Sequence, residues 1–337
     1  MATKILFFNH KGGVSKTTST FNIGWKLAEL DKKVLLVDAD PQCNLTAFFL
    51  NDKFDEYYVN EETKAHNIMS GVKNAFDGNP TLIEPINCPT HCRNKNLFLL
   101  PGHMNLSELE AQLTFALTAS MTLTSLQNLP GSFNDLINKT SEEYDIDYVL
   151  IDVNPGLGAI NQDLFLISDG FIVPTNPDLF CIMAIKGLSK ILPAWVKWKN
   201  QNLPDFQHAA YPLPDTTSKF IGIIIQRFNI RNGLAAAPYQ DIIADIKTTI
   251  SNIFVPAIKP MNMLFDDDKY IQDYCLGEIK DFASLGQKAQ LSHVPIFALT
   301  DEELGNSGVV LEQLKETRTT FNKQFDDIAK HIIQIYE

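Results

Sequence analysis

The residues best suited to chemistry lie near the start of the chain, where an apolar run breaks into a short segment of glycine, lysine and hydroxyl side chains. The run is Ile5–Phe8, and the segment Asn9–Thr18 reads NHKGGVSKTT. In a strand–loop–helix unit of this kind, backbone N–H groups and the positive end of the helix dipole bind phosphate oxygens. Lys16 would neutralise the β- and γ-phosphates of a nucleotide, and Thr17 would place its hydroxyl on Mg²⁺. The spacing therefore predicts a phosphate-binding loop.

This segment differs from the usual phosphate-loop pattern, G-x-x-x-x-G-K-[ST], at both outer glycines. His10 stands at the first of these positions, and Ser15 stands just before the lysine. Ser15 keeps the backbone N–H but adds a side chain in a crowded place, and its effect on binding depends on the φ angle there. The alternative is a glycine-containing β-turn before an ordinary helix. Apolar residues that continue at helical spacing through Leu30 favour the phosphate loop.

Two further apolar runs end in carboxylates. One run, from Lys33, ends at Asp38 and Asp40, and the other, from Asp147, ends at Asp152. Continuous apolar runs fit parallel strands buried on both faces, and the carboxyl ends of such strands face the crevice where ligands bind. Asp152 would hold Mg²⁺ through a water, because this ion keeps several waters and needs only one or two carboxylates. The alternative for the first pair is a helix cap, a common role for a strand-terminal aspartate.

The motif Lys11-Gly12-Gly13-x-x-Lys16-Thr17-Thr18 resembles the deviant Walker A box of the ParA/MinD family of P-loop ATPases. The segment Asp38–Asn44 resembles the family's first switch segment, D-x-D-P-Q-x-N. The resemblance implies ATP and Mg²⁺ as cofactors, and an ATP-sandwiched homodimer in which Lys11 reaches the partner's phosphates. It also implies that Asp40 orients or deprotonates the attacking water and that Asp38 sits near the magnesium shell with Thr17 and Asp152. The residues implied to bind the nucleotide are Lys11, Gly12, Gly13, Val14, Ser15, Lys16, Thr17 and Thr18, and those implied in catalysis are Lys11, Lys16 and Asp40.

Softer resemblances to the same family continue along the chain. Asp152–Gly158 resembles the second switch, D-x-P-P-x-x-G, although Asn154 replaces one proline. Thr175–Asp178 resembles the turn P-x-x-P-[DE] that leads into a long helix, and Gln226–Arg231 resembles the turn that forms the base pocket. Asn229 is the candidate for reading the adenine edge. An ordinary polar turn residue is the equal alternative.

Hydrophobic patterning predicts the elements that must position these residues. We expect one doubly wound, mainly parallel α/β domain over residues 1–337, with an insertion around 51–96 and a C-terminal helix at about 309–336. Within the insertion, helical turns are expected around Glu61–Lys73. The remaining expected elements are a strand at 97–100, a helical run at 106–117, a helix from about Leu179 to Lys199 kinked at Pro193, a surface connection at 201–218, a strand at Lys219–Ile225 and a strand at Val294–Leu299.

Composition favours a cytoplasmic protein with reduced thiols. The chain has 337 residues, 45% of them hydrophobic, and we find no run of about 18 apolar residues and no targeting signal at its start. Because the first strand follows Met1 almost at once, we expect no DNA-reading domain before it. The five cysteines are scattered, and a zinc site at Cys88–Cys92 lacks a second ligand pair at matching spacing.

The family resemblance implies slow, partner-stimulated hydrolysis of ATP that controls dimerisation. The leading hypothesis is DNA partition, with nonspecific DNA bound by the dimer on the nucleoid and a ParB-like adaptor stimulating release. Against it stands the charge, with 28 Lys+Arg against 40 Asp+Glu and a net charge of −12. A local basic patch, from Lys186 to Lys199 or near Arg227 and Arg231, would be needed. The alternative is an orphan switch ATPase that positions or regulates a protein complex; membrane cycling ranks third, because the C-terminal end is too mixed in character.

Overall fold

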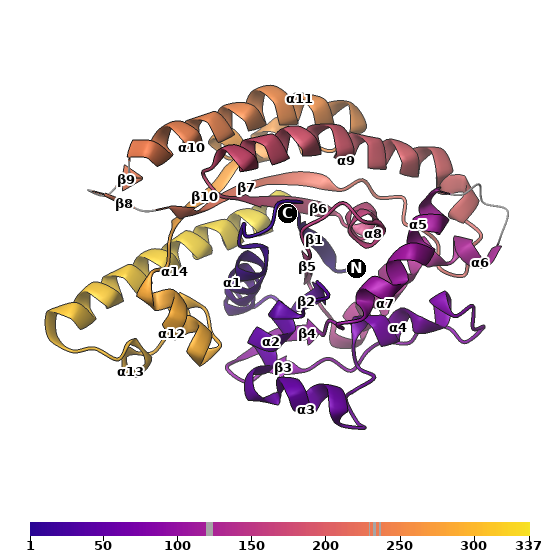
Figure 1. The fold of residues 1–337 in the computed structure, drawn as a ribbon, viewed down its shortest axis with the longest axis horizontal. Coiled ribbons are helices and arrows are strands. Elements are labelled where there is room, and N and C mark those ends of the chain that lie inside the picture. Colours follow the sequence, from indigo (N-terminus) through magenta and orange to yellow (C-terminus); the bar gives the residue numbers. More distant parts are fainter. Residues whose placement is uncertain (119–123, 229, 232–233, 236) are drawn as a thin grey trace.

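The centre of the fold is a mainly parallel eight-stranded sheet with β1 in its middle (Figure 1). The computed structural model describes residues 1–118, 124–228, 230–231, 234–235 and 237–337. The strand order is β10-β7-β6-β1-β5-β2-β4-β3, and every neighbouring pair is parallel except β3 and β4. The strands are β1 Thr3–Phe7, β2 Val34–Ala39, β3 Thr90–His91, β4 Asn94–Leu100, β5 Tyr148–Val153, β6 Gly170–Thr175, β7 Lys219–Phe228 and β10 Cys275–Lys280, and a separate hairpin pairs β8 Ile230–Arg231 with β9 Leu234–Ala235.

Helices cover both faces of this sheet, because its strands direct alternate apolar side chains into two cores. Ile5 and Phe7 belong to one buried cluster with residues of α1 and α14, while Leu6 and Phe8 belong to a second cluster with residues of α4, α5 and α7–α11. The helices are α1 Lys16–Glu29, α2 Asn44–Leu50, α3 Phe54–Val59, α4 Ile68–Phe76, α5 Glu110–Thr118, α6 Thr124–Gln127, α7 Leu129–Tyr144, α8 Ala159–Ile167, α9 Leu179–Phe206, α10 Ala237–Thr249, α11 Val255–Ile258, α12 Ser284–Ser292, α13 Asp301–Leu304 and α14 Gly308–Tyr336. The predicted doubly wound α/β class is confirmed.

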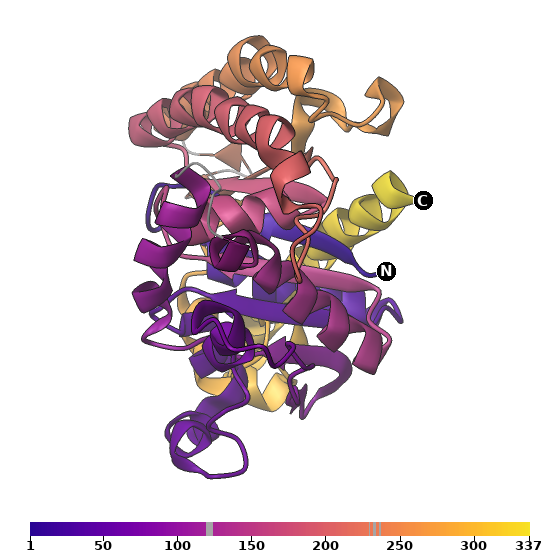
Figure 2. The ribbon, with the colours of Figure 1, turned by 90° about the vertical axis from the view of Figure 1, so that its right-hand side faces the viewer.

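Both chain ends lie on the same side of the molecule (Figure 2). Glu337 forms an ion pair with Lys32, which comes just before β2, so this side is the amino edge of the sheet. The loop between β1 and α1 leaves from the opposite, carboxyl edge. Ligand sites of open parallel sheets lie at that carboxyl edge.

The strand predicted at Val294–Leu299 is wrong. Its centre, Ile296–Ala298, forms a 3₁₀ turn that packs against α12 and α14, and this packing buries Val294 and Leu299 as well. The last strand is instead β10, a mixed sequence that includes Glu278 and Lys280. Because β10 lies at the edge of the sheet and pairs only with β7, it needs fewer buried side chains than a central strand.

The expected helical turns at Glu61–Lys73 are displaced. The structure has α3 before them and α4 overlapping their end, where the Asn67 side chain caps α4 by accepting from the N–H of Ser70. Helix α4 packs on α7 through Val72 and its apolar neighbours, and β3 joins the sheet. The region 51–96 therefore contributes to the core as well as to the surface.

Helix α9 is longer than expected, since it continues through Pro193 and ends at Phe206, so the connection to β7 begins at 207. By length and composition alone α9 could cross a membrane, although the chain was expected to have no such apolar segment. The core helix of a soluble protein passes the same test, and α9 buries Ile185, Leu188 and Leu192 against the sheet and packs on α8, α10 and α11 (Figure 1). One face of α9 is therefore part of the core.

Candidate functional site

The loop between β1 and α1 has the backbone geometry of the predicted phosphate loop. Gly13 has φ 72°, and Ser15 has φ 61° and ψ 35°, so both residues are left-handed. The serine thus adopts the conformation that glycine usually supplies, at a cost of roughly 1 kcal/mol for a residue with a Cβ atom. Helix α1 begins at the next residue, Lys16, and leaves its first N–H groups at the loop.

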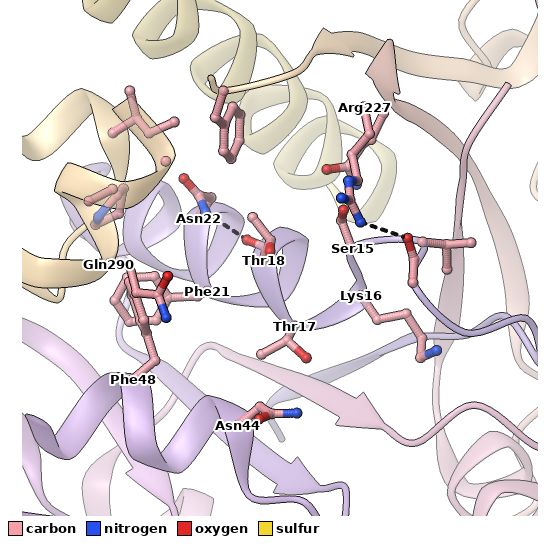
Figure 3. Close-up of a pocket in the computed structure, with 18 of the residues that line it drawn as sticks. Ser15, Lys16, Thr17, Thr18, Phe21, Asn22, Asn44, Phe48, Arg227 and Gln290 are labelled. Atoms are coloured by element: carbon pink, nitrogen blue, oxygen red, sulfur yellow. Dashed lines mark hydrogen bonds between the residues drawn. The ribbon is translucent and has the colours of Figure 1, made fainter. Parts of the chain in front are cut away.

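A cavity of ≈ 800 Å³ opens beside this loop (Figure 3). One end, which we call the loop end, is lined by Gly13–Thr18 and Asp40. The other, which we call the far end, is lined by Phe282, Gln287 and Gln290 with their neighbours in residues 280–296. The fold therefore gathers most of the predicted binding residues around one space.

Lys16 is almost fully buried at the loop end. Its Nζ donates to two backbone carbonyls, 3.1 Å from Asn9 O and 3.4 Å from Lys11 O. Burial lowers the pKa of Lys16, and the negative charges of Asp152 and Asp40 oppose that shift. A cation held in place by neutral carbonyls is ready to bind an anion that enters the cavity.

Asp38 and Asp152 lie next to each other at the ends of β2 and β5, and both are fully buried. The Asp38 carboxylate accepts hydrogen bonds from the N–H and hydroxyl of Thr46, at 2.8 and 2.6 Å, and from the N–H of Asp40 at 3.2 Å. Burial raises the pKa of Asp38 to about 6, although the Thr46 hydrogen bonds oppose this. These hydrogen bonds from Asp40 and Thr46 to Asp38 fix the position of the segment that carries Asp40.

Asp152 differs from Asp38, because both of its carboxylate oxygens are buried without a well-formed hydrogen bond from a described residue. Burial and the charge of Asp38 raise the pKa of Asp152, while the nearby Thr17 hydroxyl lowers it. Within the part of the chain that the structure describes, no three His, Cys, Asp or Glu side chains cluster as metal ligands. With Thr17 beside it, the Asp152 carboxylate would suit Mg²⁺, an ion that takes few ligands from the protein and completes its shell with phosphate oxygens and waters.

Asp40 lines the cavity, and its Oδ1 accepts the N–H of Gln42 at 2.9 Å. Lys11, in contrast, does not line its own cavity. Its Nζ lies 2.6 Å from Asp178 Oδ2, and Asp178 also caps α9 by accepting from the N–H of Cys181. Partial burial alone would lower the pKa of Lys11, but the hydrogen bond and charge of Asp178 raise it above its usual value.

The second switch segment is held by two residues that the sequence analysis missed. Asn161 Nδ2 donates to the backbone of Asn154 and Gly156, and the Glu110 carboxylate accepts the first N–H groups of α8. A Cβ atom at Gly158 would clash with this carboxylate, which explains the glycine there. Glu110 lies in an ordinary helical run of the sequence, and no local signal marks it.

The far end of the cavity was not predicted. Asn229, the candidate for reading adenine, lies outside the described residues, whereas Arg227 two positions earlier lines the cavity. Phe282, Gln287 and Gln290 come from a stretch to which the sequence analysis gave no role. Only the pairing of β10 with β7 brings that stretch beside the loop.

The structure also places two other segments considered in the sequence analysis, the basic run Lys186–Lys199 and the cluster Cys88–Cys92. Lys199 is buried, and its Nζ donates to the carbonyls of Leu166 and Thr216, so it cannot belong to an exposed basic patch. His91 is buried against aromatic rings, with its ring centroid 4.7 Å from that of Trp25, while the neighbouring Cys92 is exposed. All five cysteines are free thiols.

Comparisons with known proteins agree with this geometry. A family model described as an AAA domain matches residues 2–206. An uncharacterized protein of Mycobacterium tuberculosis is 34% identical over 184 residues, which are 55% of this chain and 50% of that protein. The chromosome-partitioning ATPase Soj of Treponema pallidum is 27% identical over 263 residues, 78% of this chain and 85% of Soj. The chain thus spans only about half the length of the M. tuberculosis relative.

Among solved structures, the ATP complex of a McdA variant from Cyanothece superposes with a TM-score of 0.63 at 18% identity, covering 98% of this chain and 96% of that chain. At this identity the likeness shows the fold. The family model covers the loop with its two lysines and the segments 38–44 and 152–158 that resemble the family's switches, on strands of one mainly parallel sheet. The chain therefore belongs to the ParA-like P-loop ATPases.

Proposed function

We propose that this protein is an ATP-dependent dimerisation switch, formed by a single domain over residues 1–337. The observation that carries the proposal is the loop end of the cavity, where Lys16, Thr17 and Asp40 line one space and the carboxylate of Asp152 is buried next to Thr17. A triphosphate fits there, because backbone N–H groups and a buried cation supply what its oxygens need. The far end, where Phe282, Gln287 and Gln290 offer an aromatic ring and two amides, would then receive the base.

The proposed hydrolysis asks little covalent chemistry of the protein. Lys16 binds the β- and γ-phosphates, and Thr17 with Asp152 holds Mg²⁺, which when bound would spread and neutralise phosphate charge. Asp40 lies at the cavity wall on a segment fixed by Asp38, and it orients or deprotonates the attacking water. In the assembled dimer, Lys11 of each chain adds positive charge to its partner's phosphates.

A second copy of this chain is the proposed occupant of the surface beside Lys11. Exposed apolar side chains gather on the loops of this edge, with Leu157 in the second switch segment and Phe180 and Met183 on the first turns of α9. Phe180 and Met183 are 70% and 67% exposed, which is unusual for large apolar residues. Lys11 must leave Asp178 before it can reach a partner, so the Lys11–Asp178 ion pair would oppose dimerisation in the absence of ATP.

The proposed process is DNA partition, with a ParB-like adaptor stimulating hydrolysis and the ATP-bound dimer held on nucleoid DNA in the cytoplasm. Its support is the likeness to Soj of Treponema pallidum, a chromosome-partitioning ATPase. Lys186, Lys190 and Lys197 are exposed on α9 and form no ion pair with a described residue, so they offer a local basic patch. The second candidate is an orphan switch ATPase with little DNA affinity, which the net charge of −12 favours.

The test is DNA binding by Asp40→Ala with ATP and Mg²⁺, at low and at physiological salt. This variant should bind ATP and dimerise but lose roughly 10²–10³ in turnover, because it lacks the group that activates water. ATP-dependent binding that weakens steeply with salt, and that disappears when Lys186, Lys190 and Lys197 are also changed to alanine, would support partition. An ATP-bound dimer that does not bind DNA at either salt concentration would favour the orphan switch. Hydrolysis of ATP by Asp40→Ala at the wild-type rate would refute the role of Asp40.

A further inference from the structure

Arg227 lines the cavity next to the loop and comes from β7, on another part of the chain. It lies near the carboxyl end of β7, with a left-handed backbone at φ 60°, and its side chain points to the loop beside Ser15 (Figure 3). The guanidinium Nη1 donates to Gly13 O at 3.2 Å. For a residue with a Cβ atom, this backbone conformation costs about 1 kcal/mol, and such strained residues are common at ligand sites.

The charge of Arg227 has no acidic partner among the described residues. Two other arginines of this chain are paired: Arg93 lies 2.8 Å from Glu303 and Arg318 lies 3.0 Å from Asp301. Among the described residues, Arg227 donates a hydrogen bond to a neutral carbonyl and forms no ion pair, although Asp40 and Asp281 line the same cavity. A guanidinium has five N–H donors in a planar fork that fits phosphate oxygens, so several donors are left for a ligand.

We infer that Arg227 binds the polyphosphate of the nucleotide, opposite the N–H groups of the loop. The inference rests on the proposed function, since it assigns a further residue to the same nucleotide site. Arg227 and the loop approach the space between them from separate parts of the chain. The loop follows β1, and Arg227 is the last residue but one of β7, two strands away across β6. Phosphate oxygens between them would receive backbone N–H groups from one side and a fixed positive charge from the other.

The competing explanation is that Arg227 only supports the loop by its hydrogen bond to Gly13 O. The structure supplies a matched control for this, because Asn176 Nδ2 donates to the same carbonyl at 2.9 Å and carries no charge. If support of Gly13 O is what matters, loss of either donor should have a similar effect. If phosphate binding matters, only the loss of the arginine charge should weaken nucleotide affinity.

The experiment compares ATP affinity by titration calorimetry in the full-length wild type, Arg227→Gln, Arg227→Lys and Asn176→Ala. Glutamine keeps a donor for Gly13 O without the charge, and lysine keeps the charge without the fork. We expect Arg227→Gln to weaken ATP binding about tenfold and to flatten its salt dependence, as for the loss of one charged hydrogen bond. Arg227→Lys should retain affinity within about threefold, and Asn176→Ala within about twofold.

Wild-type affinity in Arg227→Gln, or an equal loss in Asn176→Ala and Arg227→Gln, would overturn the inference. Thermal unfolding of each variant without nucleotide shows whether it is folded, and Arg227→Lys keeps the test valid if the glutamine variant is unstable. A wild-type protein that binds no ATP would refute the proposed function itself. If the wild type binds ATP and the Arg227 variants bind it equally well, only the role of Arg227 is refuted.

Discussion

The two ends of the cavity are built in opposite ways. The loop end takes nearly all its lining groups from one continuous stretch, residues 13–18, together with Asp40 just after β2. The carboxylate of Asp152 on β5 is buried next to Thr17. The far end takes its groups from α12 and the segments around it, which approach the loop only because β10 pairs with β7. Charge and backbone N–H groups dominate the first, and neutral side chains such as Gln287 and Gln290 dominate the second. A phosphate site can therefore be encoded by a short motif of contiguous residues, whereas a base site depends on how distant segments pack.

If this contrast holds, the largest loss of binding should follow Lys16→Ala. The variant removes a buried cation beside the phosphates, at a cost of about 3 kcal/mol or roughly 10²-fold in ATP affinity. Calorimetry measures this, with Lys190→Ala on the exposed face of α9 as the control that loses a lysine elsewhere. An affinity unchanged from wild type would show that the loop is an ordinary turn.

The next effect concerns the dimer rather than the nucleotide. Lys11→Ala should bind ATP but fail to dimerise, because Lys11 lies outside its own cavity on Asp178. Asp178→Asn should do the reverse and tighten ATP-dependent dimerisation about fivefold, as expected for release of a partly exposed ion pair worth about 1 kcal/mol. Asparagine keeps the helix cap, so α9 should stay intact. Light scattering over a concentration series decides both points, and an ATP-dependent dimer of Lys11→Ala would contradict the cross-subunit role.

Changes at the far end should be smaller and selective for the base. The double variant Gln287→Ala and Gln290→Ala loses two neutral amides, and we expect ATP affinity to fall about fivefold to tenfold. Competition between ATP and GTP should also become less selective, since these side chains read the base in our proposal. Gln313→Ala on the exposed part of α14 serves as the matched control. A loss as large as that of Lys16→Ala would remove the contrast between the two ends.

The smallest effect is expected at Ser15. Ser15→Gly relieves a left-handed backbone and should stabilise the fold by about 0.5–1 kcal/mol, or roughly 1–2 °C in Tm. ATP affinity should stay within about twofold, because the serine already presents its N–H in the required conformation. Asp31→Gly, another left-handed residue remote from the cavity, should give a similar gain in Tm. A large rise in affinity in Ser15→Gly alone would show that the serine side chain obstructs the phosphates.

The class of the fold and the loop end of the site follow from patterns within single segments of the sequence. Runs such as Val34–Val37 and Val149–Ile151 are apolar at every position because their strands are buried on both faces, and this pattern needs no knowledge of neighbours. The loop could be predicted because a backbone nest and one lysine are contiguous in the chain. The edge strand β10 could not, because an edge strand with one pairing partner has no continuous apolar pattern.

The use of the remaining groups depends on contacts between distant segments, which the structure shows. It distinguished Asp38, which is tied to Thr46, from Asp152, whose carboxylate stays open, although both end apolar strands in the same way. It placed Lys11 on Asp178 and Glu110 on the start of α8, contacts that join residues far apart in the chain. Such contacts depend on strand order and helix packing, and a pattern within one segment does not encode them. The far end of the cavity is decided in the same way, by the position of β10 beside β7.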